Sequence, residues 1–357
     1  MAKIVFFVNK LSETGGSERV ATVLANQLAQ IGHEVSFITW IGPKECFFDL
    51  HDSIRIYNLY DNQINIFKSY FPSLIRYKKI LKKLKPDRVI DVCTAMSLLS
   101  IPATIFTKSK VITWEHFNTS VNWNFFTARL SRFLSAQFSN KVVTLTEIDK
   151  KNYENKFYAK NAVTISNPIT IVLGEEDKAD LSAKKVLAIG RLTNQKGFDL
   201  LLHAWKIVCD IENEWTLTIV GDGELKEELM NLARSLNLEK KIIFEKPTNN
   251  VNKYYKSSSI YVMSSRFEGL PLVLIEAKSF GLPIISFDCK TGPREIVRSN
   301  VDGILVPPEN IDLLSRALFD LISDRSKREE YSKKSLEDVS RFSLSSFVSK
   351  WQEIINL

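Results

Sequence analysis

The 357-residue sequence predicts an α/β protein made of two successive doubly wound units, each with a parallel sheet. Residues 3–39 have the pattern strand, glycine loop, helix and strand with which such a unit opens. After a polar stretch at 174–185, apolar strands and amphipathic helices alternate again. We therefore place one domain at 1–170 and a second at 171–341, with a final helix in 342–357.

Apolar runs bounded by turn residues define the strands of the first domain. Gly32 ends the first predicted helix, and Gly16 in the preceding loop lies where backbone amides could approach a phosphate. A simple tight turn explains the same glycine equally well. The strands are predicted at 3–9, 34–39, 88–92, 111–113, 142–146 and 163–167.

His116 is the histidine best placed for function in the first domain. It follows the strand at 111–113, and ligands of such sheets bind beyond the carboxyl ends of the strands. The alternative is an ordinary histidine buried in the core. Nearby, exposed aromatic and basic residues are expected to share a surface patch made of Phe125, Phe126, Phe133, Arg129 and Arg132.

The second domain repeats the alternation of strand and helix. A helix is expected from 198 to 209, and a short one begins at Pro293. Its strands are predicted at 186–190, 215–220, 242–244, 260–263, 283–287 and 303–306.

Composition narrows the protein class. Hydrophobic residues make up 45% and charged residues 25%, as in ordinary globular proteins. No apolar run is long enough for a transmembrane helix, and the N-terminus lacks the pattern of a signal peptide. The four cysteines are widely spaced, which favours a reducing cytosol and argues against a zinc site or a disulfide framework.

The net charge of +7 is concentrated in the first domain. Residues 1–170 carry 22 Lys and Arg against 13 Asp and Glu, and the remainder carries 26 against 28. A basic half indicates an anionic partner, and no nucleic-acid-binding motif is present. The amphipathic stretch 66–85 suits an anionic membrane interface, although an ordinary surface helix fits as well. The cations that we assign to membrane or acceptor contact are Arg76, Lys78, Lys79, Lys82 and Lys83.

Residues 264–283 contain the densest cluster of candidate functional residues. Glu268 lies in a turn after the strand at 260–263, and Gly269 and Pro271 favour that turn because glycine permits positive φ and proline is tolerated where a helix begins. An acidic residue is thereby expected at the carboxyl edge of the sheet.

The helix that follows this turn is predicted to form an anion site. The amides of Leu272 and Val273 have no partner within a helix that starts there, and such an end binds phosphate. Glu268 beside this site and Glu276 inside the helix could hydrogen-bond the hydroxyls of a nucleotide sugar. A capped helix with one solvated and one salt-bridged glutamate is the alternative.

Arg191 and Lys196 are predicted to form a diphosphate clamp. They flank a loop between a strand and a helix that starts near Gly197, where fixed positive charge would stabilise a leaving phosphate. Two solvated cations in a loop would be the ordinary interpretation. The clamp is favoured because these residues, Glu268 and Glu276 all follow strands of one sheet.

Together these motifs resemble the family-4 retaining glycosyltransferases of GT-B architecture, in the branch that builds bacterial lipopolysaccharide, capsule or exopolysaccharide. The resemblance spans nearly the whole chain, apart from the loop after Phe244, where many members have glycine and this chain has Glu245-Lys246-Pro247. The residues that carry it are Gly15–Glu18, Glu115-His116, Gly190-Arg191, Lys196-Gly197, Gly221–Gly223, Glu268, Glu276, Gly281–Pro283 and Thr291–Glu295.

The resemblance implies two Rossmann-like domains facing across a cleft, with the last helix crossing back to the first domain. It implies a UDP-sugar donor held mainly by residues 171–341, a glycan or lipid-linked acceptor on residues 1–170, and no metal or other cofactor. The location implied is cytoplasmic, peripheral on the inner face of the bacterial membrane, with no nucleic-acid partner.

Roles follow residue by residue from the resemblance. Glu268 would contact the transferred sugar and Glu276 the ribose, while His116 would lie near the reacting carbon. The catalytic set is Glu268, His116, Arg191 and Lys196. The donor-binding set is Gly16, Arg191, Lys196, Gly221, Pro247, Glu268, Gly269, Leu270, Leu272, Val273 and Glu276.

The expected chemistry is transfer with retention at the anomeric carbon. The leaving phosphate would take the proton of the acceptor, since no second acid is well placed, and Glu268 would orient the sugar without becoming a covalent nucleophile. Two other functions remain open from the sequence: a UDP-sugar epimerase of GT-B fold, and a non-catalytic protein that binds nucleotide sugars.

Overall fold

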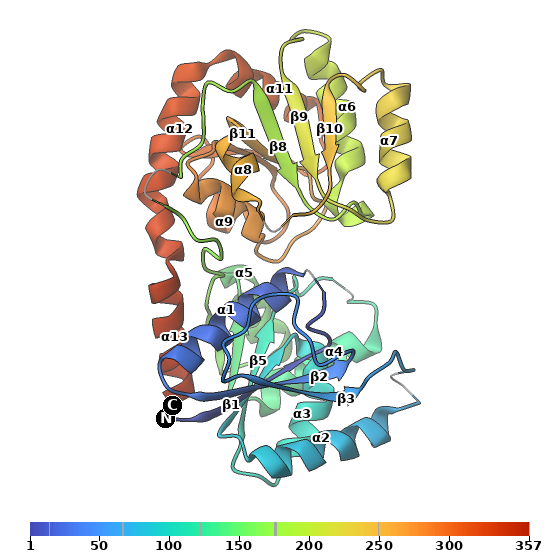
Figure 1. Cartoon of the computed structure of the whole chain (residues 1–357), viewed down its shortest axis with the longest axis vertical. Helices are drawn as coiled ribbons and strands as arrows, with labels where there is room; N and C mark the ends of the chain where they lie inside the picture. The colour runs from blue at the N-terminus through green and yellow to red at the C-terminus, as the bar shows by residue number, and fades with distance from the viewer. Residues whose placement is uncertain (14, 66–67, 122, 175–176, 249, 357) are drawn as a thin grey trace. The chain divides into compact units, whose positions relative to one another are not determined.

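The computed structural model describes residues 1–13, 15–65, 68–121, 123–174, 177–248 and 250–356 (Figure 1). Within these ranges the chain divides into two compact units. Unit 1 comprises residues 1–170 and 344–357, and unit 2 comprises residues 171–343. Parts of the predicted glycine loop, basic stretch, linker, loop 245–250 and final helix lie outside the described residues, namely Thr14, Ile66, Phe67, Glu175, Glu176, Asn249 and Leu357.

Unit 1 contains a seven-stranded parallel sheet with the order β3-β2-β1-β4-β5-β6-β7. The inner strands are buried on both faces, which is why they read as continuous apolar runs. The strands are β1 (Lys3–Val8), β2 (Glu34–Ile41), β3 (Arg55–Tyr60), β4 (Arg88–Val92), β5 (Lys110–Glu115), β6 (Lys141–Thr144) and β7 (Ala162–Thr164).

Strand β3 was not predicted from the sequence. It forms the edge of the sheet and buries only Leu59 fully, so it lacks the apolar run that marks the inner strands. The other twelve strands lie where the apolar runs predicted them, within a few residues at their ends. The two parallel α/β sheets confirm the predicted fold class.

The helices of unit 1 pack against its sheet (Figure 1). The C-terminal helix returns to this unit: the ring of Trp351 lies 4.6 Å and that of Phe347 6.1 Å from the ring of Trp114 in β5. The helices are α1 (Gly16–Gln30), α2 (Tyr70–Leu84), η1 (Thr94–Met96), α3 (Ser97–Thr104), α4 (Phe126–Phe138), α5 (Glu147–Phe157) and α13 (Leu344–Asn356).

Helix α2 carries the basic stretch and turns its apolar face toward the core of unit 1. Tyr77 and Leu81 are buried in that core, and Leu74 and Leu84 pack against it. This face is therefore not available to a membrane, because it already covers the sheet. Only Phe71 and Ile75 remain as large exposed apolar side chains of the helix, 73% and 69% exposed.

Unit 2 contains a six-stranded parallel sheet with the order β10-β9-β8-β11-β12-β13. The first strand, β8, is central, so the chain winds outward on one side and then on the other. The strands are β8 (Lys185–Ile189), β9 (Thr216–Val220), β10 (Ile242–Glu245), β11 (Ile260–Met263), β12 (Ile284–Phe287) and β13 (Gly303–Val306).

The helices of unit 2 begin where polar side chains cap them. Asn310 accepts a hydrogen bond from the amide of Leu313 at the start of α11, and Asp324 accepts one from Lys327 at the start of α12. The helices are η2 (Asn194–Lys196), α6 (Phe198–Cys209), α7 (Lys226–Ser235), α8 (Asn252–Lys256), α9 (Leu272–Ser279), α10 (Pro293–Ile296), α11 (Ile311–Ser323), α12 (Arg325–Asp338) and η3 (Val339–Phe342).

Helix α9 is fixed from behind by a buried ion-pair network. Lys278 is fully buried, and its Nζ lies 2.7 Å from Asp302 Oδ2 and 2.8 Å from Asp338 Oδ2. It also donates to the carbonyl of Ile296 at 3.0 Å. Because a buried ammonium needs such partners, this network specifies the position of α9 against α12 and β13. Among the described residues no helix has the length and apolar character needed to cross a bilayer.

Asp91 in β4 is a buried acid without a cation. Ser100 Oγ donates to its Oδ2, whereas Oδ1 has no partner among the described residues. Burial raises the pKa of Asp91 well above its ordinary value, and the Ser100 hydrogen bond lowers it only partly. The nearby Tyr77 hydroxyl also has no partner, and burial followed by the charge of Asp91 raises its pKa.

We expect Asp91→Asn to stabilise the protein at neutral pH. A carboxyl whose folded pKa is raised favours folding only below its unfolded pKa, and this benefit is lost as pH rises through the folded pKa. At pH 7 the substitution should therefore raise the free energy of unfolding by about 1–3 kcal/mol. Urea denaturation at pH 7 and pH 4.5 measures this, and the gain should shrink at the lower pH. A loss of similar size at both values would contradict the prediction.

Candidate functional site

The candidate site in unit 2 lies where the strand order reverses. Strands β8 and β11 are neighbours, while β9 lies on the other side of β8. In open α/β sheets ligands bind beyond the carboxyl ends of the strands at such a switch point. Lys196 follows β8 and Glu268 follows β11, so these two predicted residues lie on the two loops that meet there.

Small residues let the loops at this edge approach each other closely. A Cβ atom on Gly221 would lie 1.9 Å from the carbonyl oxygen of Gly190. Gly292 has φ +98°, and a Cβ there would lie 2.4 Å from the carbonyl oxygen of Gly269. These contacts give a packing reason for the glycines of the predicted motifs, because no side chain fits between the backbones.

Lys196 and Glu268 form a buried ion pair. Lys196 Nζ donates to Glu268 Oε1 at 2.6 Å, and the side chains are only 16% and 7% exposed. The stem of Lys196 runs beside Gly190, where a Cβ atom would lie 3.3 Å from it. The sequence predicted separate roles for these two side chains at phosphate and sugar, and it did not predict that they pair.

Backbone and side-chain bonds hold the two loops in register around this pair. Ser264 Oγ donates to the carbonyl of Lys196 at 3.0 Å, and the amide of Arg266 donates to the carbonyl of Gln195 at 2.8 Å. In return, Gln195 Nε2 donates to the carbonyl of Phe267 at 3.0 Å. The bonds flank Lys196 and Glu268 on both sides, so the pair cannot separate by a simple drift of either loop.

Arg266 connects this pair of loops to helix α6. Its Nη1 and Nη2 donate to the two carboxylate oxygens of Asp199 at 2.9 and 2.6 Å, and Nη1 also donates to the carbonyl of Asn194 at 2.8 Å. Burial would raise the pKa of Asp199, but the hydrogen bonds and charge of Arg266 lower it overall. Sequence reasoning missed this clamp, because a lone arginine in a loop and an aspartate in a helix give no signal of contact.

The start of α9 has the predicted form. Pro271 is the residue before the helix, and its carbonyl accepts the first bond, from Leu274 at 3.1 Å. The amides of Leu272 and Val273 precede this bond, and neither donates to a protein acceptor within the described residues. The positive end of the helix dipole therefore lies beside the loop of Glu268.

Glu276 lies inside α9 in a setting unlike that of Glu268. It is 2% exposed, and its Oε2 accepts a hydrogen bond from the hydroxyl of Tyr255 at 2.9 Å. Tyr255 is completely buried and comes from α8. One glutamate thus has a cationic partner and the other a neutral hydroxyl.

The remaining predicted donor residues of unit 2 are less enclosed. Arg191 opens the loop after β8 and is exposed to solvent, and Pro247 is exposed after β10. The amide of Gly221 donates to the carbonyl of Glu245 at 2.9 Å, which joins the ends of β9 and β10. Leu270 is buried in the turn before α9. No item of geometry brings Arg191 to Lys196, so the predicted clamp of two cations stays a prediction.

Gly16 and His116 belong to unit 1. Gly16 is the first residue of α1, directly after β1 and its loop. His116 follows β5, is 9% exposed, and has no partner for Nε2 among the described residues. Burial lowers the pKa of His116 to about 3, so its imidazole is neutral at physiological pH.

A buried network holds the segment next to His116. Arg132 Nε donates to Glu115 Oε2 at 2.9 Å, and the hydroxyl of Tyr153 donates to the same oxygen at 3.1 Å. Oε1 of Glu115 accepts the amide of Phe117 at 3.2 Å, which fixes the chain on both sides of His116. Arg132 is 3% exposed, so its predicted place in a surface patch is wrong: its charge is needed inside to neutralise Glu115.

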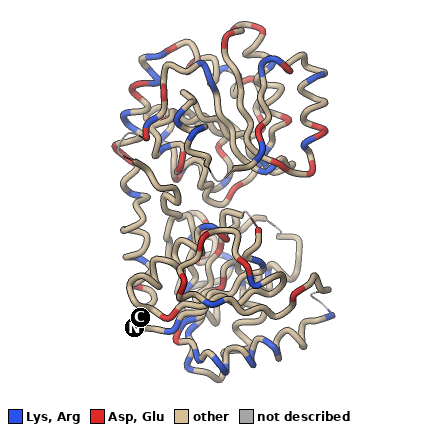
Figure 2. The backbone as a smooth tube through the Cα atoms, viewed as in Figure 1, with Lys and Arg blue, Asp and Glu red and all other residues tan. Residues whose placement is uncertain are grey.

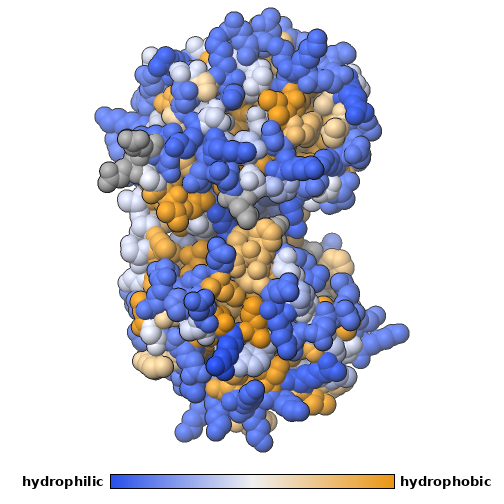
Figure 3. Space-filling view, in the orientation of Figure 1, coloured by the Kyte–Doolittle hydropathy of each residue, from blue (hydrophilic) through white to orange (hydrophobic). Residues whose placement is uncertain are grey.

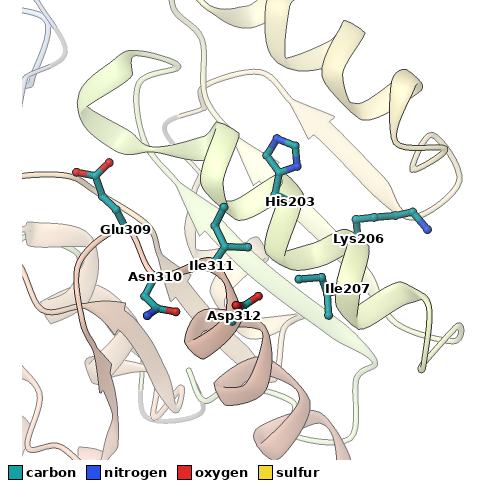
Figure 4. Close-up of a pocket in the computed structure, with 7 residues that line it drawn as sticks. All are labelled: His203, Lys206, Ile207, Glu309, Asn310, Ile311 and Asp312. Carbon is teal, nitrogen blue, oxygen red and sulfur yellow. The ribbon is translucent and has the colours of Figure 1, made fainter.

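The largest hollow of unit 2 shown in Figure 4 lies apart from these predicted residues. Glu309 on its wall pairs with Arg266 at 3.3 Å, which is its link to the clamp. Within the described ranges no group of three or more His, Cys, Asp or Glu side chains is arranged to hold a metal ion. The hollow lies between α6 and the start of α11 and is lined by His203, Lys206, Ile207, Glu309, Asn310, Ile311 and Asp312.

Comparison with known proteins places both units in described families. Residues 175–338 match the family described as "Glycosyl transferases group 1", and residues 14–172 match "Glycosyltransferase Family 4". An uncharacterized glycosyltransferase of Haemophilus influenzae is 37% identical over 99% of this chain and 100% of its own. The amylovoran biosynthesis glycosyltransferase AmsD of Erwinia amylovora is 32% identical over 100% of both chains.

Two further similarities concern acceptor and fold. The GalNAc-α-(1->4)-GalNAc-α-(1->3)-diNAcBac-PP-undecaprenol α-1,4-N-acetyl-D-galactosaminyltransferase of Campylobacter jejuni is 29% identical over 99% of this chain and 98% of its own. The crystal structure of S. aureus TarM in complex with fondaparinux, α-GlcNAc-glycerol and UDP has a TM-score of 0.85, with 17% identity and 100% of both chains covered. At that identity the structural likeness shows the fold alone.

We expect Lys196 and Glu268 to be coupled in stability. Lys196→Met leaves a buried carboxylate without its cation, and Glu268→Gln leaves a buried ammonium, each at a cost of about 3–5 kcal/mol. The double variant should lose less than the sum of the two, with a coupling energy of about 1–3 kcal/mol in urea denaturation.

The exposed pair Lys334–Glu337 is the matched control, because its Nζ–Oε2 distance of 3.0 Å is similar but its side chains are 42% and 48% exposed. The same cycle there should give a coupling energy near zero. Additive losses at Lys196 and Glu268 would show that the buried pair contributes no more than the exposed one.

Proposed function

The chain belongs to the family of glycosyltransferases, and from this premise we propose that it transfers a hexose or N-acetylhexosamine from a UDP-sugar to a glycan or lipid-linked glycan. The configuration at the anomeric carbon is retained, and no metal takes part. The product is a surface polysaccharide of a bacterium. The named activities of the Erwinia and Campylobacter relatives support the acceptor class, and the UDP in the TarM complex supports the donor.

The observation that carries this proposal is the buried Lys196–Glu268 pair beside the free amides at the start of α9. A diphosphate needs positive charge and N–H donors, and a sugar ring needs a carboxylate that accepts from its hydroxyls. Both requirements are met within one loop junction of unit 2. When donor binds, Lys196 and Arg191 neutralise the diphosphate together with the amides of Leu272 and Val273.

The two glutamates bind opposite ends of the donor. Glu268 accepts hydrogen bonds from hydroxyls of the transferred sugar, and Glu276 accepts them from the ribose. Gly16 allows the backbone of unit 1 to approach the phosphates, and the neutral imidazole of His116 contacts the sugar near the reacting carbon. Pro247, in the loop after β10, lies in the segment that contacts the base.

Chemistry then proceeds on one face of the sugar. The bond from the anomeric carbon to the β-phosphate oxygen breaks, and the acceptor oxygen bonds to that carbon from the same face. The proton of the acceptor hydroxyl passes to the departing phosphate oxygen, so UDP itself serves as the base. Lys196 and Arg191 stabilise the negative charge that builds on the phosphate.

Unit 1 is proposed to bind the acceptor and to rest on an anionic membrane at the inner face of the cell envelope. Figure 2 shows the basic residues along α2, and Figure 3 shows hydrophobic residues among the hydrophilic ones on the visible face of unit 1. Lys78, Lys79 and Lys82 are exposed on α2 near Phe71 and Ile75, a combination that suits a bilayer interface.

Two of the predicted membrane cations already have contacts within unit 1. Arg76 Nη1 donates to the carbonyl of Leu59 at 2.7 Å, and its guanidinium lies 4.3 Å from the centre of the Tyr60 ring. Lys83 Nζ lies 5.7 Å from the centre of the Tyr57 ring. Membrane attraction is therefore assigned mainly to the other three lysines of α2.

The direct test is incubation with a panel of UDP-sugars and a lipid-linked oligosaccharide acceptor. A matching donor at 100 times its Kd should stabilise the protein by about 2.7 kcal/mol, which thermal shift detects before turnover is assayed. We expect transfer with retention, read by NMR of the new linkage, and a loss of about 100-fold in kcat for Glu268→Gln. Donor conversion without acceptor, binding without turnover, or a stable glycosyl adduct on Glu268 would each contradict the proposal.

Binding to anionic vesicles tests the membrane surface separately. Reversing Lys78, Lys79, Lys82 and Lys83 to Glu should reduce co-sedimentation with phosphatidylglycerol vesicles by at least about tenfold, since each cation near the surface contributes about 1 kcal/mol. Activity on a soluble acceptor should remain. Unchanged vesicle binding would refute the role of α2. The control reverses four exposed lysines elsewhere: Lys151, Lys160, Lys240 and Lys333.

A further inference from the structure

Tyr255 has a single prominent polar contact, and that contact is with Glu276. Its hydroxyl donates to Glu276 Oε2 at 2.9 Å, and the two side chains are 0% and 2% exposed. Water does not compete for a hydrogen bond that is shielded to this degree, so the bond orients the carboxylate strongly. A tyrosine hydroxyl donating to a carboxylate is also a charge-assisted bond, which is shorter and stronger than a neutral one.

The surroundings hold Tyr255 rigidly in this position. Its ring stacks on that of Phe280, with centroids 5.1 Å apart and planes at 15°. Helix α8, which carries it, is tied to the start of unit 2: Lys256 Nζ lies 2.7 Å from Asp177 Oδ1, and Asn252 Nδ2 donates to the carbonyl of Val172 at 3.2 Å. The hydroxyl therefore reaches Glu276 from a fixed support and does not follow the carboxylate if it turns.

A neutral donor has a different effect on a glutamate from a cation. Lys196 compensates the charge of Glu268, whereas the phenol of Tyr255 orients Glu276 and leaves its negative charge in place. A carboxylate has about four acceptor positions, so Glu276 retains capacity for ribose hydroxyls after accepting from Tyr255. Burial raises the pKa of the tyrosines next to this site, as for Tyr261, so a phenol here remains protonated and acts as a donor.

We propose that Tyr255 is a positioning residue that fixes the Glu276 carboxylate in the orientation required to accept hydrogen bonds from the ribose of the donor nucleotide. The inference rests on the proposed function, because it takes the ribose role of Glu276 from there. Tyr255 lies behind Glu276 and touches no substrate. Its contribution is to spare the carboxylate the loss of rotational freedom that binding would otherwise require.

The test compares two nucleotides and three variants by calorimetry. UDP and 2′,3′-dideoxy-UDP differ only in the ribose hydroxyls, so the ratio of their Kd values reports the ribose contact alone. Tyr255→Phe keeps the ring and its stacking on Phe280 and removes only the hydroxyl. We expect it to weaken UDP by about fivefold to tenfold and to leave dideoxy-UDP unchanged, so that the ratio falls.

Glu276→Gln separates this inference from the proposed function. If Glu276→Gln leaves the ratio at the wild-type value, or wild type does not bind UDP, the proposed function fails at this site and the inference falls with it. If Glu276→Gln lowers the ratio but Tyr255→Phe leaves it at the wild-type value, or weakens both nucleotides equally, the inference alone is overturned. Tyr331→Phe, a buried tyrosine of α12 in the same unit, is the matched control and should bind both nucleotides as wild type does.

Discussion

The candidate site of unit 2 depends on the junction of two loops that follow the neighbouring strands β8 and β11. Hydrogen bonds between Gln195, Lys196, Ser264 and Phe267 lace these loops together, and the Lys196–Glu268 pair closes the junction. Neither charged side chain is stable in its buried place without the other, because an unpaired buried charge costs several kcal/mol. The same pair supplies the two chemical functions that a sugar diphosphate requires.

The structure uses buried polar contacts differently at each functional residue. Glu268 is neutralised by an ammonium, Glu276 is oriented by a phenol, and Lys278 one turn further along α9 is neutralised by Asp302 and Asp338. Since α9 carries two of these groups and opens with unpaired amides, its position governs the whole donor side. This explains why contacts from α8, β13 and α12 all converge on it.

Unit 1 shows a parallel arrangement around a different residue. His116 remains neutral because it is buried, while the adjacent Glu115 holds its charge through Arg132. The helix α2 illustrates how one amphipathic pattern has two interpretations: its apolar face covers the sheet, and its lysines remain outside. An apolar face directed to a core and one directed to a membrane have the same period, so periodicity alone does not separate them.

The sequence by itself determined the two parallel α/β sheets, twelve of the thirteen strands and the form of the loop at 268–273, because these follow from local patterns: apolar runs, glycines and a proline before a helix. The edge strand β3 escaped, since it buries too little apolar surface to be read. Only the tertiary structure decided that Lys196 pairs with Glu268, that Tyr255 reaches Glu276, that Arg266 clasps Asp199 and that Arg132 lies inside. The physical reason is that each of these contacts joins residues from separate elements of the chain, and which of many possible partners meet is set by the order of strands in the sheet and by burial, neither of which a local pattern contains.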